Sequence, residues 1–394
     1  MCRSSWLHTK RRVWLRNHTR AWPGHAAPLR GPTRWITDPR ACGALASRAV
    51  PRAVSNPPNP WHSRSVELLG PSPELELAVY EEECQSIVSA NESADVPFRF
   101  SVNPYRGCFH ACAYCYARPT HQYLDWGAGT DFERRIVVKV NAAEKLREWL
   151  AGHRGRRELI AFSGVTDCYQ PLEASYELTR ACLEACREFR QPVGVITKGA
   201  LVERDAELLA RVNERAAARV YVSLAFADDG DARLLEPYAA PPSRRLATIA
   251  RLAAAGVPVG VAVAPVIPGL NDHQIPAILA AARAAGASRA FLTLLRLPAE
   301  VLPVFTERLR EAFPARADKV LSLLAQLRQG DLQDARIGHR MRGEGPRYAV
   351  VERLFDLHCR RLGLASRETD LAFEAQRPRQ GELFGNPGGR SGCR

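Results

Sequence analysis

The sequence has 394 residues, 46% of them hydrophobic, so it can bury a large core and is long enough for one barrel with appendages or for two domains. No run of 18 or more uncharged apolar residues occurs, which argues against a transmembrane helix. The net charge of +13 lies mostly at the start, because residues 1–60 hold 11 basic residues and one acid, whereas the other 334 hold 44 basic and 41 acidic residues.

Residues 1–55 are predicted to be a disordered basic extension, followed by a lead-in segment over 56–96. The extension is rich in Arg, Trp and Pro and lacks both apolar periodicity and the apolar core of a secretory signal. An Arg-rich start also fits an organellar transit peptide or an upstream start codon. However, the whole chain carries 50 Arg and only 5 Lys, a bias that GC-rich coding alone would produce.

From residue 97 the chain alternates between strand-like and helical patterns, which predicts an α/β fold with about six parallel strands. The strand-like runs are 97–102, 158–163, 192–197, 219–224, 258–263 and 289–294. Helical patterns at 143–151, 174–189, 205–216, 243–255 and 275–285 are long enough to connect parallel strands. Helical patterns at 301–312 and 316–328 and a basic loop at 336–347 predict a helical C-terminal cap over 301–365, followed by a flexible tail.

Three cysteines, Cys108, Cys112 and Cys115, follow the first predicted strand with the spacing Cys-x3-Cys-x2-Cys. Thiolates this close in a loop can converge on one metal centre. No fourth ligand lies nearby, and an open coordination position suits a catalytic centre better than a structural one. The spacing therefore predicts an iron–sulfur cluster with one reactive iron; structural zinc and unliganded thiols are the alternatives.

The number of cysteines also indicates the cellular compartment. Eleven cysteines in a chain of this length, three of them clustered, fit metal chemistry in a reducing compartment better than a disulfide scaffold. We therefore expect a cytoplasmic protein with no membrane association. The oligomeric state stays open.

The cysteine run and further motifs resemble the radical S-adenosylmethionine (radical SAM) superfamily, in particular the DNA-repair-photolyase-like proteins related to spore photoproduct lyase. The resemblance covers about residues 55–365. It rests on the runs 103–108, 117–124, 165–173, 197–198, 236–237, 244–246, 264–272, 295–298 and 338–343. It implies a TIM-like partial (β/α)6 barrel at about 97–300.

The resemblance also implies the cofactors. A 4Fe-4S cluster would bind S-adenosylmethionine at its open iron, and an electron from an external reductant of flavodoxin or ferredoxin type would release a 5′-deoxyadenosyl radical that takes a hydrogen atom from the substrate. Residues at positions that match the superfamily's cofactor contacts are Tyr114, Ser163, Gly164, Ser223, Pro265 and Val266. The alternatives are that Ser163 and Gly164 only form a turn and that Ser223 is a half-buried strand serine.

Four further candidates follow strands of the predicted barrel, where the working residues of such folds lie. Lys198 and Arg296 could hold a carboxylate or phosphate, or could be solvated rim charges. Cys168 could return a hydrogen atom to a product radical, although its position does not match the donor cysteine of spore photoproduct lyase. Tyr169 could orient a substrate, or could belong to the start of the following helix.

The substrate prediction is a nucleic-acid base or nucleotide, by analogy with spore photoproduct lyase. Arg336, Arg340, Arg342 and Arg347 and the N-terminal arm are the candidate phosphate contacts. Two alternatives have other functions: a non-enzymatic nucleic-acid-binding protein stabilised by a metal, and an electron-transfer iron–sulfur protein. The missing fourth cysteine argues against the second.

Overall fold

The computed structural model describes residues 76–153, 158–333 and 335–366, all within one compact unit of the chain. The predicted N-terminal extension and residues 367–394 of the predicted tail lie outside these ranges. None of the described helices combines the length and the hydropathy of a membrane span.

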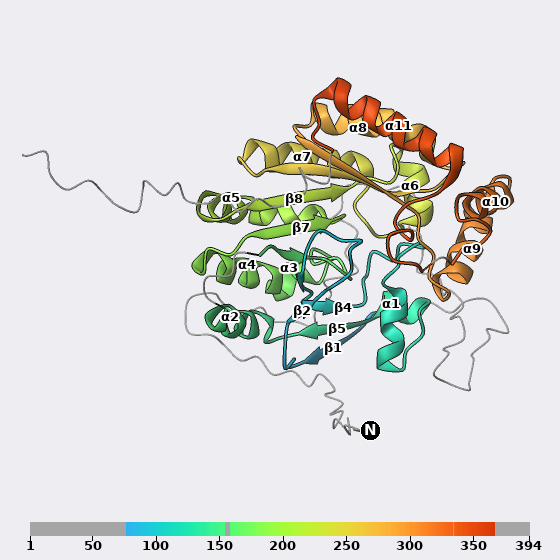
Figure 1. Cartoon of the computed structure of the whole chain (residues 1–394). Helices are drawn as coiled ribbons and strands as arrows, with labels where there is room; N and C mark the ends of the chain where they lie inside the picture. Colours follow the sequence, from blue (N-terminus) through green and yellow to red (C-terminus); the bar gives the residue numbers. More distant parts are fainter. Residues whose placement is uncertain (1–75, 154–157, 334, 367–394) are drawn as a thin grey trace, which may run out of the picture. The chain divides into compact units, whose positions relative to one another are not determined.

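A seven-stranded sheet lies at the centre of the unit, in the order β10-β9-β8-β7-β6-β3-β2 (Figure 1). Its strands are β2 Val88–Ala90, β3 Phe100–Val102, β6 Ile160–Phe162, β7 Val193–Thr197, β8 Ala218–Ser223, β9 Val259–Val266 and β10 Arg289–Leu294. All neighbours pair in parallel except β2, which is antiparallel to β3. The six parallel strands coincide with the six predicted runs, and the predicted α/β fold class is confirmed.

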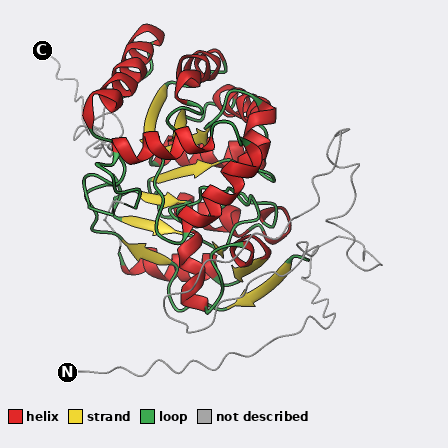
Figure 2. Ribbon diagram, turned by 90° about the vertical axis from the view of Figure 1, so that its right-hand side faces the viewer, coloured by secondary structure: helices red, strands yellow, loops and turns green. Residues whose placement is uncertain are grey.

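Helices connect the parallel strands and cover the sheet. They are α2 Ala142–Gly152, α3 Glu173–Tyr176, α4 Leu178–Glu188, α5 Ala206–Arg215, α7 Pro242–Ala254 and α8 Ile275–Ala284. All but the four-residue α3 bury one apolar face, and in α4 this face includes Cys182 and Cys186, which are fully buried core residues. In the side view of Figure 2 the strands follow one another through the unit with the helices packed beside them.

The sheet does not close on itself, since β10 and β2 are its two edges, as expected of a partial barrel. Beyond β10 the chain forms the predicted helices α9 Val301–Ala312 and α10 Ala317–Leu327. The sequence patterns did not predict the third, α11 Gly345–Leu362, which packs along α8 (Figure 1). Its buried residues Tyr348, Val351, Phe355 and Cys359 form a narrow stripe that the exposed charged residues between them obscure.

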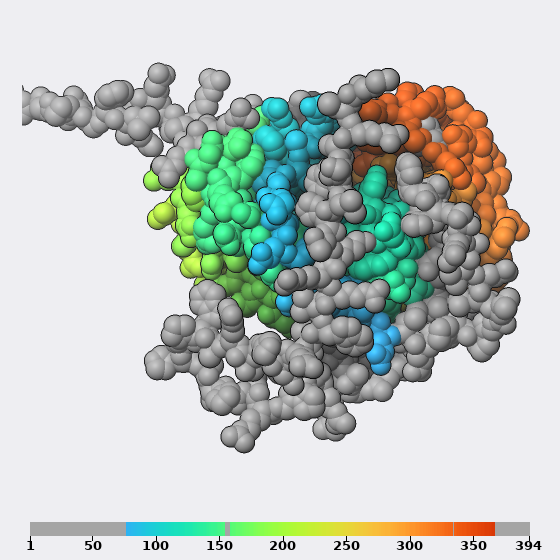
Figure 3. Space-filling model, turned by 90° about the horizontal axis from the view of Figure 1, so that it is seen from below, coloured from blue at the N-terminus to red at the C-terminus, as the bar shows by residue number. Residues whose placement is uncertain are grey.

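A second sheet of three strands, in the order β1-β5-β4, was not predicted either. It consists of β1 Ala78–Glu82, β4 Tyr105–Arg106 and β5 Arg135–Lys139. Figure 3 shows the face on which the blue start of the described chain runs beside its green and teal parts. Short helices complete the unit: η1 Arg118–Leu124, α1 Thr130–Arg134, η2 Ala200–Asp205, α6 Asp229–Leu235 and η3 Asp272–Gln274.

Candidate active site

The three cysteines of the motif lie on one loop, here called the cysteine loop (residues 107–117), at the carboxyl end of the parallel strands. Cys108 and Cys112 are buried and Cys115 is partly buried. Cys115 packs both with the apolar cluster that contains Cys108 and with the cluster that contains Cys112. The loop therefore gathers the three thiols into one neighbourhood.

The donor set fits an iron–sulfur cluster better than a single ion. Among the described residues, no three Cys, His, Asp or Glu side chains come close enough to hold one metal ion. A cluster, by contrast, takes thiolates at separate irons. Burial raises the pKa of all three thiols, that of Cys112 to about 12, so without metal they would be neutral. A coordinating metal removes this proton.

A buried arginine, which the sequence analysis did not single out, holds the cysteine loop in shape. Arg118 is fully buried and donates to the carbonyl oxygen of Cys112 from Nε at 3.1 Å and from Nη2 at 2.8 Å. It also donates to the carbonyl oxygens of Ala128 and Gly129 and pairs with buried Glu133 at 2.5 Å. The charge of Arg118 is thus balanced by Glu133, and its N–H groups donate to carbonyl oxygens of the cysteine loop and of residues 128–129.

Gly107 is required before the first cysteine. Its φ is +80°, a region that L side chains rarely adopt. A Cβ atom there would lie 2.8 Å from Cε1 of His121 and 2.9 Å from the carbonyl oxygen of Phe132. Only glycine fits this close approach of the loop to its surroundings.

Asp167, which follows β6, links the cysteine loop to the end of β7. It accepts hydrogen bonds from Thr197 Oγ1 at 2.6 Å and from the Lys198 amide at 2.7 Å, and it lies 3.4 Å from Nδ1 of His110 in the cysteine loop. Gln170, in the same segment, donates to the carbonyl oxygen of Gly107 and thus forms a second contact between this segment and the cysteine loop. The run 165–173 therefore acts as a brace between strands and loop.

A second buried network joins the cysteine loop to β8. The Tyr114 hydroxyl donates to Glu236, which also pairs with Arg245; both charged groups are almost fully buried. Arg245 in turn donates to the carbonyl oxygen of Ser223 at 2.9 Å. The position of Tyr114 is thereby fixed relative to Ser223 at the end of β8.

The predicted cofactor-binding turn at Ser163 and Gly164 contains a residue with a positive φ. Ser163 has φ +70°, and its Oγ accepts a hydrogen bond from the Cys168 amide at 2.9 Å. The carbonyl oxygen of Gly164 accepts from the hydroxyl of Tyr116 at 2.8 Å, which brings the turn beside the cysteine loop. A residue other than glycine is strained at a positive φ, and such strained residues cluster at functional sites. The backbone conformation of Ser163 therefore agrees with a functional role for this turn.

At the end of β9, the predicted cofactor-binding residues Pro265 and Val266 are held in place by hydrogen bonds, one of them from an asparagine. Asn271 is buried, and its amide nitrogen donates to the carbonyl oxygens of Pro265 at 3.0 Å and Ala225 at 2.7 Å. The carbonyl oxygen of Val266 accepts from the Leu295 amide at 2.9 Å. The ends of β8, β9 and β10 are thus fixed to one another.

Two predicted catalytic residues lie in the core. Tyr169 is 1% exposed, and its hydroxyl donates to buried Asp205 at 3.1 Å. Cys168 is also 1% exposed, and its carbonyl oxygen accepts from Thr179. These positions favour structural roles, because neither side chain is available to a substrate in this conformation.

Two other predicted residues, Lys198 and Arg296, are partly buried cations at the carboxyl end of the sheet. Lys198 lies with Nζ 5.6 Å from the centroid of the Tyr114 ring, and its charge lowers the pKa of Cys112 and of Cys115 against the effect of burial. In the part of the chain that the structure describes, no carboxylate pairs with either Lys198 or Arg296. Both therefore present uncompensated positive charge.

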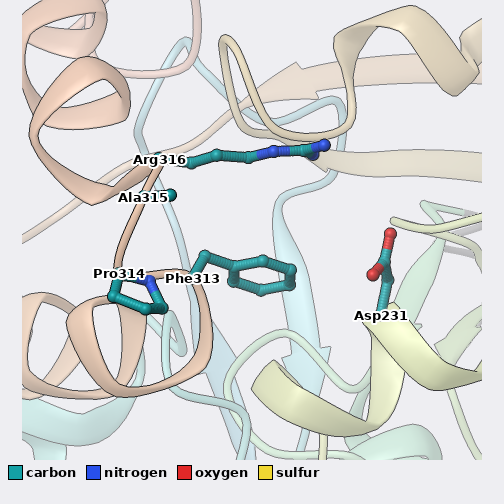
Figure 4. A pocket seen from close by; sticks show the side chains of 5 residues that line it. All are labelled: Asp231, Phe313, Pro314, Ala315 and Arg316. Atoms are coloured by element: carbon teal, nitrogen blue, oxygen red, sulfur yellow. The ribbon is translucent and has the colours of Figure 1, made fainter.

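A surface hollow elsewhere does not involve these residues. It has a volume of about 300 Å³ and is lined by Asp231, Phe313, Pro314, Ala315 and Arg316. Phe313 and Arg316 extend from the turn between α9 and α10 toward Asp231 of α6 (Figure 4). It contains no member of the cysteine loop, so it is not the candidate active site.

Comparison with known proteins agrees with this geometry. The profile of the Radical SAM superfamily matches residues 102–282. An uncharacterized protein of Mycobacterium tuberculosis is 41% identical over 215 residues, which cover 54% of this chain and 63% of that protein. A radical SAM Nα-GlyT isomerase of Pseudomonas phage M6 is 27% identical over 230 residues, 58% of this chain and 46% of that protein.

Among solved structures, spore photoproduct lyase complexed with dinucleoside spore photoproduct has a similar fold, with a TM-score of 0.53 at 15% identity over 73% of this chain and 81% of that one. The chain spans less than two thirds of the length of the mycobacterial relatives that it matches. Membership of the superfamily implies a 4Fe-4S cluster and radical chemistry. The cysteine loop, the parallel sheet and the profile together identify residues 102–282 as a domain of the radical SAM superfamily.

Proposed function

We propose that this protein is an enzyme that holds a 4Fe-4S cluster through Cys108, Cys112 and Cys115, cleaves S-adenosylmethionine and acts on a nucleic-acid base or nucleotide. The observation that supports it most is the loop that gathers three thiols where the parallel strands end. When bound, cluster and S-adenosylmethionine supply a 5′-deoxyadenosyl radical through one-electron cleavage of the sulfonium bond.

Around that position the chain offers groups suited to S-adenosylmethionine. The turn at Ser163 and Gly164 lies next to the cysteine loop through Tyr116, and Ser223 is placed through Tyr114 and Arg245. The uncompensated ammonium of Lys198 suits the carboxylate of the methionyl group. Buried apolar residues of the cysteine loop and of α9 limit the access of water.

The substrate class rests on analogy. The similar fold of spore photoproduct lyase is seen with a dinucleoside bound, and the predicted basic segment 336–347 carries four arginines, of which Arg347 lies in α11 rather than in the loop. Arg340 is paired with Asp95 and Arg336 lies 3.8 Å from Glu344, so nucleic acid would have to compete for these two side chains. A cytoplasmic location with a flavodoxin- or ferredoxin-type electron donor belongs to the same proposal.

The decisive experiment is anaerobic reconstitution followed by reduction and addition of S-adenosylmethionine. We expect close to four irons per chain, a perturbed electron paramagnetic resonance signal and slow formation of 5′-deoxyadenosine. Cys108→Ala should lose the iron, whereas Cys186→Ala, which changes a core cysteine of α4, should keep it. Stoichiometric zinc without iron would refute the proposal.

The same experiment separates the alternatives. An electron-transfer protein would contain the cluster but leave S-adenosylmethionine intact. A metal-stabilised nucleic-acid-binding protein would take up zinc and bind nucleic acid without S-adenosylmethionine. Formation of 5′-deoxyadenosine excludes both.

A further inference from the structure

Arg296 follows β10 directly after Leu295, whose backbone is fixed by two hydrogen bonds. Next to Arg296, the amide of Leu295 donates to the carbonyl oxygen of Val266 at 2.9 Å, and the carbonyl oxygen of Leu295 accepts from Arg328 at 2.8 Å. Arg328 is 4% exposed, so this anchor lies inside the protein. Arg296 is therefore presented by a rigid part of the fold.

The same buried arginine brings a second guanidinium group close. Arg328 donates to the carbonyl oxygens of His339 at 3.1 Å and of Arg340 at 2.9 Å, which ties the loop 336–344 to the end of β10. The charge of Arg340 acts on Arg296 and lowers the pKa of its guanidinium, in addition to the larger effect of burial. Two guanidinium groups thus share one region.

Only one of these charges is neutralised. Asp95, whose side chain is 2% exposed, pairs with Arg340 through Oδ2 and accepts from the Gly338 amide through Oδ1 at 2.5 Å. Ser93 Oγ also bonds to Asp95 Oδ2, at 3.3 Å, and accepts from Arg340 at 2.6 Å. Asp95 thus bonds to Arg340, Gly338 and Ser93 and acts on Arg296 only electrostatically, so the half-buried Arg296 has no ion-pair partner among the described residues, which is costly unless an anion binds there.

The groups that face Arg296 locate this charge within the site. Besides Arg340 and Asp95, Tyr116 of the cysteine loop interacts with it electrostatically. Tyr116 is 47% exposed and donates to the carbonyl oxygen of Gly164. An anion held by Arg296 would consequently lie beside the cysteine loop and the predicted cofactor turn.

We propose that Arg296 is a substrate-binding residue that receives an oxyanion of the substrate, a phosphate or a carboxylate, at the end of β10. The planar guanidinium offers two parallel donors that match either group. This inference rests on the proposed function, because it names the chemistry by which that site would hold its substrate. Lys198, whose Nζ lies 5.6 Å from the centroid of the Tyr114 ring, remains the candidate contact for the cofactor.

Binding of inorganic phosphate and of acetate to the full-length, cluster-loaded protein tests the inference, with sodium chloride keeping the ionic strength constant. A ligand that binds the native state raises Tm in a saturable way. We expect such a rise with at least one of the two anions, and a Kd at least tenfold weaker in Arg296→Gln. Arg353→Gln, which removes an exposed charge from α11, should bind as the wild type does.

The outcome also identifies the anion. A response to phosphate alone assigns a phosphate-bearing substrate, and a response to acetate alone assigns a carboxylate. Unchanged affinity in Arg296→Gln, or no saturable response in the wild type, overturns the inference. If Arg296→Gln does not fold, Arg296→Lys keeps the charge without the two parallel donors, and wild-type affinity in that variant would equally overturn the bidentate site.

Failure of this inference can be told apart from failure of the proposed function. Formation of 5′-deoxyadenosine without substrate does not require the substrate's anion, so Arg296→Gln should retain it. Loss of that reaction in Arg296→Gln would show that Arg296 serves the cofactor or the fold and would overturn the inference. If the wild type forms no 5′-deoxyadenosine, the proposed function is refuted. The anion titration then still tests whether Arg296 binds an oxyanion.

Discussion

At the scale of single residues, His121 combines burial with an unmatched ring nitrogen. It is fully buried, and its Nε2 lies 2.8 Å from the carbonyl oxygen of Arg135, which identifies Nε2 as the protonated nitrogen. Its Nδ1 has no hydrogen-bond partner among the described residues. Burial lowers the pKa of this imidazole to about 4, so the histidine is neutral in the folded protein at pH 7.

This lowered pKa predicts a pH dependence of stability. Between pH 6.5 and 4 the unfolded chain binds a proton at His121 that the folded protein does not, so the free energy of unfolding falls as the pH falls through this range, by up to about 3 kcal/mol. In His121→Gln, which keeps a donor for the Arg135 carbonyl, the loss should be smaller. Urea unfolding at pH 7.5 and 5.0, with iron content measured in parallel, checks this, and equal losses would contradict it.

Arg118 belongs to the same scale because one side chain serves the whole cysteine loop. Arg118→Ala removes the donors from the Cys112 carbonyl and leaves buried Glu133 only the longer contact with Arg308 at 3.9 Å. We expect a loss of about 3–5 kcal/mol in the free energy of unfolding together with loss of iron. Arg135→Ala breaks a largely exposed pair with Asp131 and should cost less than about 1 kcal/mol with iron retained. Retention of iron in Arg118→Ala would contradict this role.

At the scale of elements, the contact of Asp95 with Arg340 links the two edges of the open sheet. Asp95 follows β2, the strand at one edge, and the loop that carries Arg340 is tied to β10 at the other edge through Arg328. Burial alone would raise the pKa of Asp95, but the Gly338 amide and Arg340 outweigh it and hold the pKa below its usual range. The link is therefore charged at neutral pH and closes the gap that the sheet leaves.

Asp95→Asn should loosen this link without unfolding the barrel. We expect a loss of about 1–3 kcal/mol, since Arg340 loses its charged partner but remains partly exposed. Hydrogen exchange should accelerate at the Gly338 amide and in the loop 336–344. Glu158→Gln, which breaks an exposed pair with Arg99 at 3.4 Å, should leave exchange in that loop unchanged. Unchanged exchange in Asp95→Asn would show that the link is not the closing contact.

At the scale of the whole molecule, the distribution of charge bears on nucleic-acid binding. Outside residues 1–60 the chain is close to neutral, so phosphate contacts would come from local arginines. Within the loop 336–347, Arg340 is paired with Asp95, and Arg336 lies 3.8 Å from Glu344. The predicted basic loop thus retains less available charge than its sequence indicates.

If the protein binds nucleic acid, affinity should fall steeply with salt, and loss of each phosphate contact should reduce the slope by about one unit. A chain that starts at Ser55 should keep the part of the affinity that depends on Arg342 and Arg347, and Arg340→Gln should change it least. Fluorescence titration with single- and double-stranded DNA and RNA at several salt concentrations measures these slopes. No binding of any form at low salt would contradict a nucleic-acid substrate and favour a small molecule or a protein.

The sequence by itself determined the order of the parallel strands and of the helices between them, and it predicted the cofactor chemistry that the superfamily implies. Both depend on local patterns: apolar runs that are long enough for buried parallel strands, and a three-cysteine spacing within eight residues. Helix periodicity is also a local pattern: residues four apart lie on the same face of a helix. For this reason Cys182 and Cys186 on α4 could be assigned to the core from the sequence.

Tertiary structure alone decided which side chains surround the cysteine loop. Tyr114 meets Glu236 across 122 positions of the chain, and Arg340 meets the hairpin at Ser93 across 247. The motif runs contained Arg118, Asp167, Glu236, Arg245 and Asn271, but spacing along the chain does not show which residues pair with one another, so their roles as braces could not be predicted. Tertiary structure also placed Tyr169 in the core and gave Arg296 no ion-pair partner among the described residues. Whether a polar side chain is buried or paired depends on neighbours that only the folded chain brings together.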